Sequence, residues 1–252
     1  MNYKLTLQYD GTEFHGWQLQ GTLRTVQGEL TRALLLLDGQ AVVVHGAGRT
    51  DAGVHAEGQV AHVHLRHEMT PEKLRAAING NVGRDLRALR VEIVPDDFHA
   101  RFAARGKTYC YRVCNAPFHS PFLLRYSHHD ARKLDIELLR EGARLFVGTH
   151  DWTAFSCARA DVASRVRTLS RLDVREEWNE AGQCRLIELT LNADGFLRYM
   201  ARSIVGTLLD VGRGALDLAA IARALKTGGR SLAGATAPAR GLTLKRVHYG
   251  DE

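Results

Sequence analysis

Cysteine is scarce in this sequence of 252 residues: only Cys110, Cys114, Cys157 and Cys184 are present, and no two of them form a C-x-x-C pair. Such spacing does not predict a disulfide framework or a thiolate zinc site, so we expect reduced, structural cysteines. Long apolar runs are also missing, and residues 1–4 do not have the pattern of a signal peptide. These absences predict a cytoplasmic protein without a membrane partner.

Clustered metal ligands are missing as well. His62, His64 and His67 are close in the sequence, but no run of acidic or thiol ligands accompanies them. Histidines that alternate along a half-exposed strand explain this pattern better than a metal site does. We therefore expect no metal.

Lysine is rare, whereas arginine is abundant. The chain has six lysines and 28 arginines, and its formal net charge is +6. Arginine's planar fork matches phosphates and base edges better than lysine does, which favours an anionic partner such as nucleic acid. Arginine-rich codon usage in a GC-rich genome is the alternative explanation, and charge alone does not decide between them.

A glycine-rich loop is the most distinctive stretch that is present. Residues 46–56, with the sequence GAGRTDAGVHA, follow the β-branched run 41–44, which we expect to form a buried strand. Three glycines in eight residues allow a tight turn and the close approach of another chain. Arg49 and Asp51 lie inside this loop, where a rigid strand would hold them up to a ligand.

Spacing alone leaves the role of this loop open. Asp51 occupies the position of the third glycine in the dinucleotide-binding pattern, so that pattern fits poorly. The Gly-Lys-Ser/Thr ending of a nucleotide-hydrolase loop is absent. A glycine-rich turn with a solvated aspartate remains a valid reading beside a catalytic one.

Hydrophobic periodicity predicts the same order of elements in both halves of the chain. We expect helices that begin and end near 25–38, 71–79, 134–147, 196–211 and 219–225, and strands at 3–9, 41–44, 59–65, 89–93, 107–113, 166–174, 186–191 and 242–249. In the strand at 166–174 the alternation predicts one face with Val166, Thr168, Ser170, Leu172 and Val174 and an arginine-rich opposite face.

Each half therefore has the order strand, helix, strand, strand, helix, strand, which is typical of ferredoxin-like domains and RNA-recognition modules. We expect an α/β (α+β) protein with an N-terminal half, 1–104, and a C-terminal half, 105–252. The two sheets would join through the strands that begin at Lys107 and Leu242 into one continuous, mostly antiparallel sheet. Helices would then cover one side, and a cleft would lie on the other.

Several segments resemble, in the same order, motifs of the tRNA pseudouridine synthase A family. The similarity covers nearly the whole chain, with one departure: Val82-Gly83 stands where the family usually has Leu-Pro. The segments are Tyr9-Asp10-Gly11-Thr12, Gly16-Trp17-Gln18, Thr25-Val26-Gln27-Gly28, the loop at 46–56, the stretch at 98–111, Phe196 to Gly206, and Ala237 to Leu242.

The resemblance implies roles for four residues. Asp51 matches the catalytic aspartate, a nucleophile in the family, and Arg49 matches an arginine that fills the space vacated by the target base. Tyr109 matches the tyrosine that lies over that base, and Arg202 matches an arginine that pairs with the aspartate. Such a pair would keep Asp51 ionised. An ionised aspartate could attack the sugar or abstract a proton from it, and the residues leave both possibilities open.

The residues by themselves also fit simpler readings. Tyr109 and Tyr111 lie on one face of a strand, where sheet aromatics are common, and we favour that reading for Tyr111. Arg202 lies four residues after Arg198, so that both would share a flank of one helix and could meet phosphate or water instead.

The resemblance further implies that the substrate is uridine at positions 38, 39 and 40 in the tRNA anticodon stem and loop. It also implies an RNA-binding cleft, a homodimer and no cofactor. The main alternative is a non-catalytic, duplicated RNA-binding module such as an RNA chaperone, although the aromatic Gly-Phe/Tyr-rich strand of RNA-recognition modules is absent. A nucleotide-cofactor enzyme is a third possibility, which Asp51 in the glycine position disfavours.

Overall fold

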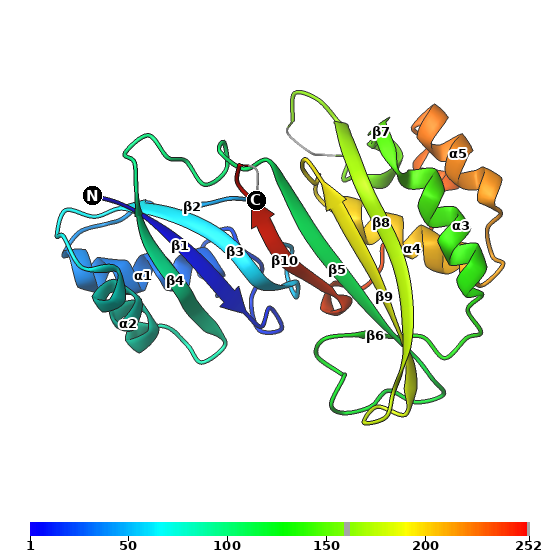
Figure 1. The fold of residues 1–252 in the computed structure, drawn as a ribbon, viewed down its shortest axis with the longest axis horizontal. Helices are drawn as coiled ribbons and strands as arrows, with labels where there is room; N and C mark the ends of the chain where they lie inside the picture. Colours follow the sequence, from blue (N-terminus) through cyan, green and yellow to red (C-terminus); the bar gives the residue numbers. More distant parts are fainter. Residues whose placement is uncertain (159–161, 251–252) are drawn as a thin grey trace. The chain divides into compact units, whose positions relative to one another are not determined.

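The computed structural model describes residues 1–158 and 162–250, which form two compact units (Figure 1). The N-terminal unit is Met1–Arg105 together with the chain from Leu244, and the C-terminal unit is Gly106–Thr243. This division differs from the expected halves, 1–104 and 105–252, at the closing strand. The α/β class with a large, mostly antiparallel sheet is confirmed.

The N-terminal unit is built around strand β1, Asn2–Tyr9, which pairs antiparallel with β3 on one side and with β4 on the other. Tyr3, Leu5 and Leu7 of β1 are fully buried, so this strand forms the centre of the core. The strand order β4-β1-β3 matches that expected for a ferredoxin-like half. The other elements of this unit are α1 (Val26–Asp38), β2 (His45–Gly46), β3 (His55–His64), α2 (Pro71–Asn81) and β4 (Leu86–Val94).

Capping residues explain where the two helices begin and end. The Thr25 hydroxyl accepts a hydrogen bond from the Gly28 amide (3.2 Å), and Gly39 ends α1 with a left-handed φ of 70°. Thr70 and Pro71 begin α2 in the same manner, with a side-chain cap and a proline in the first turn. Both helix starts predicted from the sequence are confirmed.

The strand predicted at 41–44 is wrong, because strand β2 contains only His45 and Gly46. The β-branched run lies outside any strand, with Val43 66% exposed, and the Val44 carbonyl accepts from the Gln27 side chain at 2.9 Å. Part of the outer side of β3 is occupied instead by the closing strand β10, Leu242–His248. A Cβ atom on Gly58 would lie 2.5 Å from the Lys245 carbonyl, so glycine lets the two backbones approach.

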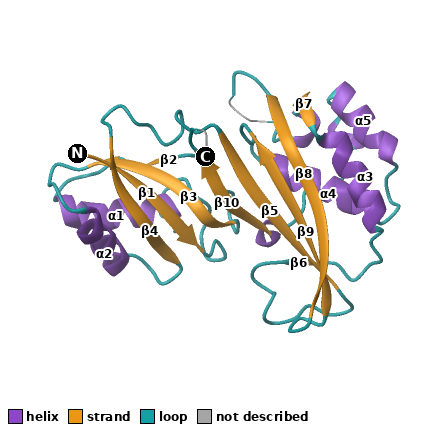
Figure 2. Cartoon of the chain, in the orientation of Figure 1, coloured by secondary structure: helices purple, strands orange, loops and turns teal. Residues whose placement is uncertain are grey.

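The C-terminal unit has the strand order β5-β9-β8-β7, with adjacent strands antiparallel (Figure 2). Helix α3 packs against α4, against α5 and against β8. The elements are β5 (Gly106–Asn115), β6 (His128–His129), α3 (Ile136–Phe146), β7 (Gly148–Asp151), β8 (Val166–Asn179), β9 (Cys184–Ala193), α4 (Met200–Gly212) and α5 (Leu218–Thr227), with short 3-10 helices at Thr153–Phe155, Arg230–Leu232 and Ala239–Gly241.

The simple alternation predicted for 166–174 is wrong because β8 contains a bulge. The pairing register with β9 shifts between Leu169 and Arg171. Leu169, Leu172 and Val174 are therefore the buried side chains, whereas Ser170 is exposed. An extra residue in one strand reverses the side-chain alternation beyond it.

Helix α4 begins later than the periodicity predicts. Tyr199 has a left-handed φ of 68°, which is rare for a residue other than glycine, and the helix starts at Met200. Arg198 therefore precedes the helix instead of sharing a flank of it with Arg202, so that prediction is wrong.

The four cysteines are free thiols, as expected, and three of them are buried. Within residues 1–158 and 162–250, no helix is both long and apolar enough to cross a membrane.

Candidate active site

Asp51 lies in the loop between β2 and β3, the glycine-rich loop of residues 47–54. Its side chain is half-buried, whereas Arg49 is exposed and Thr50 is buried between them. The Val54 amide donates to the Asp51 carbonyl at 3.1 Å, which closes a tight turn, and Gly53 in that turn has a φ of 78°. The two sequence-predicted residues of this unit therefore share one ordered loop.

Thr50 fixes the loop between these two side chains. Its hydroxyl is 2.8 Å from the Tyr9 hydroxyl, and its carbonyl accepts from the Trp17 amide at 3.1 Å. Burial raises the pKa of Tyr9 to about 12, so this phenol stays neutral. Gln59 adds a further restraint, since its side-chain amide donates to the Gly48 carbonyl at 3.0 Å.

Glycines let neighbouring segments press against the loop. A Cβ atom on Gly11 would lie 2.1 Å from the Val54 carbonyl, and one on Gly16 would lie 2.7 Å from the Thr50 carbonyl. A Cβ atom on Gly46 would lie 2.5 Å from the Trp17 ring. The Tyr9–Thr12 and Gly16–Gln18 motifs therefore support the Asp51 loop, a connection that the sequence did not reveal.

Gln27 ties a third motif to the same region. Its side-chain oxygen accepts from the Gln18 side chain at 2.7 Å and from the Leu19 amide at 2.8 Å, while its nitrogen donates to the Val44 carbonyl. Three separate motifs thus restrain the backbone on which Asp51 and Arg49 are carried, as a preorganised site requires.

Tyr109 lies on β5 of the C-terminal unit, opposite Leu191 of β9. Tyr109 is 6% exposed, and its ring contacts that of Phe196 edge-on, with ring centroids 4.9 Å apart. Tyr111 is fully buried and donates to the Pro238 carbonyl at 2.9 Å, which confirms the core role that we favoured for it. Burial also raises the pKa of Tyr111 well above its usual value.

Arg202 lies in the first turn of α4 and is bound twice to Ala237. Its Nε donates to the Ala237 carbonyl at 2.7 Å, and its own carbonyl accepts from the Ala237 amide at 3.0 Å. Its guanidinium also lies 5.3 Å from the centre of the Tyr199 ring. This reciprocal pair fixes the direction of the Arg202 side chain.

The segment that carries Ala237 is held along α4. The Gly234 amide donates to Thr207 Oγ1 at 2.9 Å, and the Ala235 amide donates to Asp210 Oδ2 at 3.3 Å. A Cβ atom on Gly206 would lie only 1.7 Å from the Ala235 carbonyl. Gly206 is the last residue of the segment Phe196 to Gly206 that resembles the family, and its position there was the only sequence signal for this contact.

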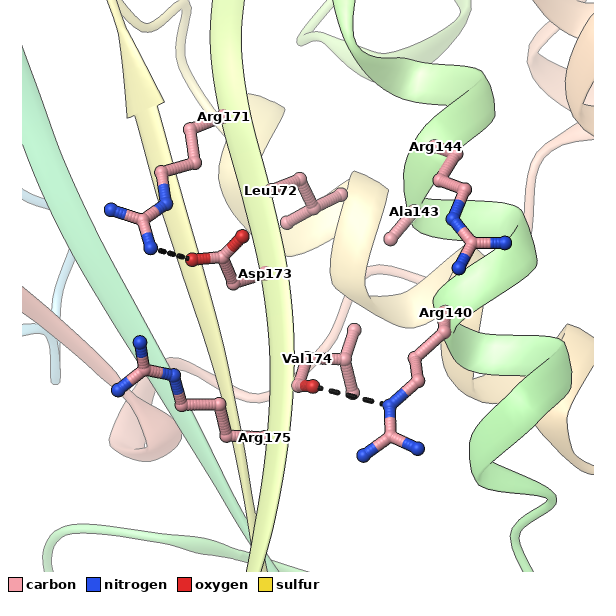
Figure 3. A pocket seen from close by; sticks show the side chains of 8 residues that line it. All are labelled: Arg140, Ala143, Arg144, Arg171, Leu172, Asp173, Val174 and Arg175. Carbon is pink, nitrogen blue, oxygen red and sulfur yellow. Dashed lines mark hydrogen bonds and ion pairs between the residues drawn. The ribbon is translucent and has the colours of Figure 1, made fainter.

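A cavity of about 380 Å³ lies elsewhere in the C-terminal unit, between α3 and β8 (Figure 3). Its lining includes none of the four sequence-predicted site residues. The residues that line it are Arg140, Ala143, Arg144, Arg171, Leu172, Asp173, Val174 and Arg175.

A family model described as tRNA pseudouridine synthase matches residues 6–103 and 143–250. The chain belongs to the tRNA pseudouridine synthase family. This confirms the resemblance inferred from the motifs. The first matched range contains Arg49 and Asp51 and the second contains Arg202, whereas Tyr109 lies between the two ranges.

Full-length relatives agree with this family. The chain is 42% identical over 252 residues to tRNA pseudouridine synthase A of Streptococcus mutans, with both chains covered completely. It is also 42% identical over 247 residues to the protein of that name from Geobacillus sp., covering 98% of this chain and 97% of the relative. A Streptococcus pyogenes protein of the same name is 40% identical over 251 residues, 99% of each chain.

Proposed function

We propose that this chain is an isomerase that converts uridine to pseudouridine at positions 38, 39 and 40 in the anticodon stem and loop of tRNA. The observation that carries the proposal is the full-length similarity to relatives named tRNA pseudouridine synthase A. The half-buried carboxylate of Asp51, in a loop restrained by three separate motifs, supports it.

The reaction needs a carboxylate but no redox change. The bond between the sugar carbon C1′ and N1 of uracil breaks, the base turns, and C1′ forms a bond with C5. C5 then loses its proton and N1 carries one, so the product is an isomer of the substrate. In this proposal the ionised Asp51 is the nucleophile that attacks the sugar, a role that carboxylates have in other sugar-transferring enzymes.

Three further residues have roles in the proposal. The target base has to leave its stack, at a cost of about a few kcal/mol. Arg49, which is exposed beside Asp51, would fill the space that the base leaves, because a guanidinium stacks and donates hydrogen bonds together. Tyr109 would stack on the turned-out base, and Arg202 would keep the reacting carboxylate ionised.

The test is to map pseudouridine in tRNA transcripts that carry uridine at positions 38–40, after incubation with the pure protein and no added cofactor. We expect product at these positions, no product with Asp51→Asn, and unchanged tRNA binding by that variant. Asp96→Asn is a matched control, since the Asp96 side chain is 90% exposed. An active Asp51→Asn enzyme would refute the role of Asp51, and tRNA binding by the wild type without product would favour an RNA-binding module.

The family resemblance also leads us to propose a cytoplasmic homodimer. Light scattering on the purified protein should then give twice the chain mass of 28.0 kDa. A mass equal to one chain would contradict the dimer without bearing on the reaction.

A further inference from the structure

In the part of the chain that the structure describes, another strand covers only part of the outer edge of β8. Strand β7 pairs with β8 over Val166–Leu169 and not beyond. Further along, α3 packs against β8, and Arg140 Nε lies 3.5 Å from the Val174 carbonyl. The cavity of about 380 Å³ lies along this part of β8.

Arginines stand on both sides of an apolar floor there. Leu172, Val174 and Ala143 are buried and form the floor. In Figure 3, Arg171 and Arg175 leave β8 on the side away from α3, whereas the other two arginines come from α3. We call the hollow with Arg140, Arg144, Arg171 and Arg175 the arginine groove.

Two of the four guanidinium groups are balanced by carboxylates. Arg171 forms an ion pair with Asp173, and Arg140 lies 2.5 Å from Glu137 and 3.9 Å from Glu176. Among the described residues, the exposed side chains of Arg144 and Arg175 contact no carboxylate. The groove therefore has a surplus of positive charge, in a chain whose net charge is already +6.

The shape of the groove favours an extended polyanion over a small anion. Pockets for small ligands are concave and surround most of the ligand. Here the guanidinium groups are spread along two elements, and in Figure 3 strand β8 and apolar side chains lie between the arginines of β8 and those of α3. A nucleic-acid backbone has phosphates at repeated intervals, separated by less polar sugars. The phosphates could contact the guanidinium groups while the sugars lie against the apolar floor.

We propose that the arginine groove binds the phosphate backbone of the RNA substrate, at a place separate from the residues that carry out the reaction. The inference rests on the proposed function for the identity of the RNA. Arg144 and Arg175 would supply the main contacts, because no carboxylate among the residues that the structure describes neutralises them. Contacts to phosphate position RNA without reading its sequence.

The experiment compares tRNA binding by the Arg144→Gln/Arg175→Gln variant with that of Arg90→Gln/Arg223→Gln. The second variant removes the same charge at exposed sites, where each arginine pairs with a carboxylate at 3.1 and 3.0 Å. We expect the groove variant to bind tRNA about tenfold more weakly, with a salt dependence reduced by about two phosphate contacts. The control should keep the salt dependence of the wild type.

A third variant, Arg144→Lys/Arg175→Lys, keeps the charge and should retain most of the salt dependence. Inorganic phosphate at millimolar concentration should not displace tRNA from the wild type. If the groove variant and the control bind tRNA with the same Kd and the same salt dependence, the groove is an ordinary solvated surface and the proposal is wrong. Strong competition by inorganic phosphate would equally overturn it, in favour of a small-anion site.

The binding measurements on the groove variants can be interpreted independently of the pseudouridine mapping that tests the reaction. The groove variants should keep the wild-type rate at saturating tRNA, with the change confined to Kd and KM. Absence of pseudouridine with the wild-type protein would contradict the proposed function, whereas equal binding by the groove and control variants would contradict the groove alone.

Discussion

At the scale of single residues, Thr50 connects the fold to the proposed chemistry. It lies between Arg49 and Asp51 and is hydrogen-bonded through both its hydroxyl and its carbonyl. Thr50 is buried and has no proposed contact with the substrate, but it positions Arg49 and Asp51, which are proposed to contact it.

Replacement of Thr50 by valine keeps the shape but removes the hydroxyl. The Tyr9 hydroxyl would keep only the longer contact of 3.4 Å with Gln59, so we expect a loss of about 1–3 kcal/mol in the free energy of unfolding. Because Asp51 is the next residue, pseudouridine formation should fall as well. Thr149→Val is the control: it removes a hydroxyl pair of 2.9 Å at an exposed site and should change neither urea unfolding nor activity.

His62 predicts a loss of stability in mild acid. It is 3% exposed, its Nδ1 accepts from the Ala100 amide at 3.1 Å, and burial together with His99, His45 and His64 lowers its pKa to about 4. In the unfolded chain the imidazole has its ordinary pKa of about 6.5 and binds a proton first. The stability that depends on neutral His62 is therefore complete above about pH 6.5 and lost as the pH falls toward 4.

Urea midpoints at several pH values between 7.5 and 4.5 test this prediction. The wild type should lose stability over this range more steeply than His62→Gln, which cannot take up a proton. Asp96, which lies 3.8 Å from His64, and the other carboxylates affect both proteins alike. Parallel curves for the two proteins would rule out His62 as the source.

At the scale of elements, helix α4 and the segment at 234–238 act as one unit that orients Arg202. Gly206→Ala would place a methyl group 1.7 Å from the Ala235 carbonyl and push away the segment that carries Ala237. We expect a loss of about 1–3 kcal/mol in the free energy of unfolding, which is typical of overpacking. The rate of pseudouridine formation should fall by a larger fraction than the free energy of unfolding does.

The matched control is Gly80→Ala in α2, where nothing lies within 4 Å of the added Cβ. Helix propensity predicts a slight gain in thermal stability for it, with activity unchanged. If Gly206→Ala retains full activity, the position of Ala237 does not matter to the reaction.

The helices and strands show how much of the fold could be predicted from the sequence. Among the described residues, periodicity and capping residues predicted the five α-helices and the seven longer strands, because amphipathic faces and local hydrogen bonds depend on the residues of each segment itself. The short strands β6 and β7, the bulge in β8 and the left-handed φ of Tyr199 were not predicted, and the strand predicted at 41–44 was wrong. Strand pairing and bulges depend on a partner strand elsewhere in the chain. Asp51, Arg49, Tyr109 and Arg202 came from the family resemblance, and the residues that support them became visible only in the structure.

At the scale of the whole molecule, the charge predicts strongly salt-dependent binding. With 28 arginines and a net charge of +6, several phosphate contacts are expected in the tRNA complex. The logarithm of affinity should then fall linearly with the logarithm of salt concentration, by about 0.9 for each phosphate contacted in a duplex. Filter binding between 50 and 200 mM salt would measure this slope, and a flat response would show that the arginines are merely solvated.

The closing strand, β10, contributes to the stability of the N-terminal unit. From Leu244 on, the chain belongs to the N-terminal unit, and Leu244 and Val247 are buried there. A chain that stops after Thr243 should therefore lose the N-terminal unit first, seen as rapid trypsin cleavage within residues 1–105. A chain that stops after Tyr249 retains β10 and should resist cleavage as the wild type does.

This arrangement has a consequence for how the protein is made. A ribosome synthesises β1 to β4 first, yet their sheet receives its last strand only after all of residues 106–243 have emerged. The unit that contains Asp51 is therefore completed last although its residues are synthesised first, and a translation product that is interrupted before Leu242 lacks strand β10.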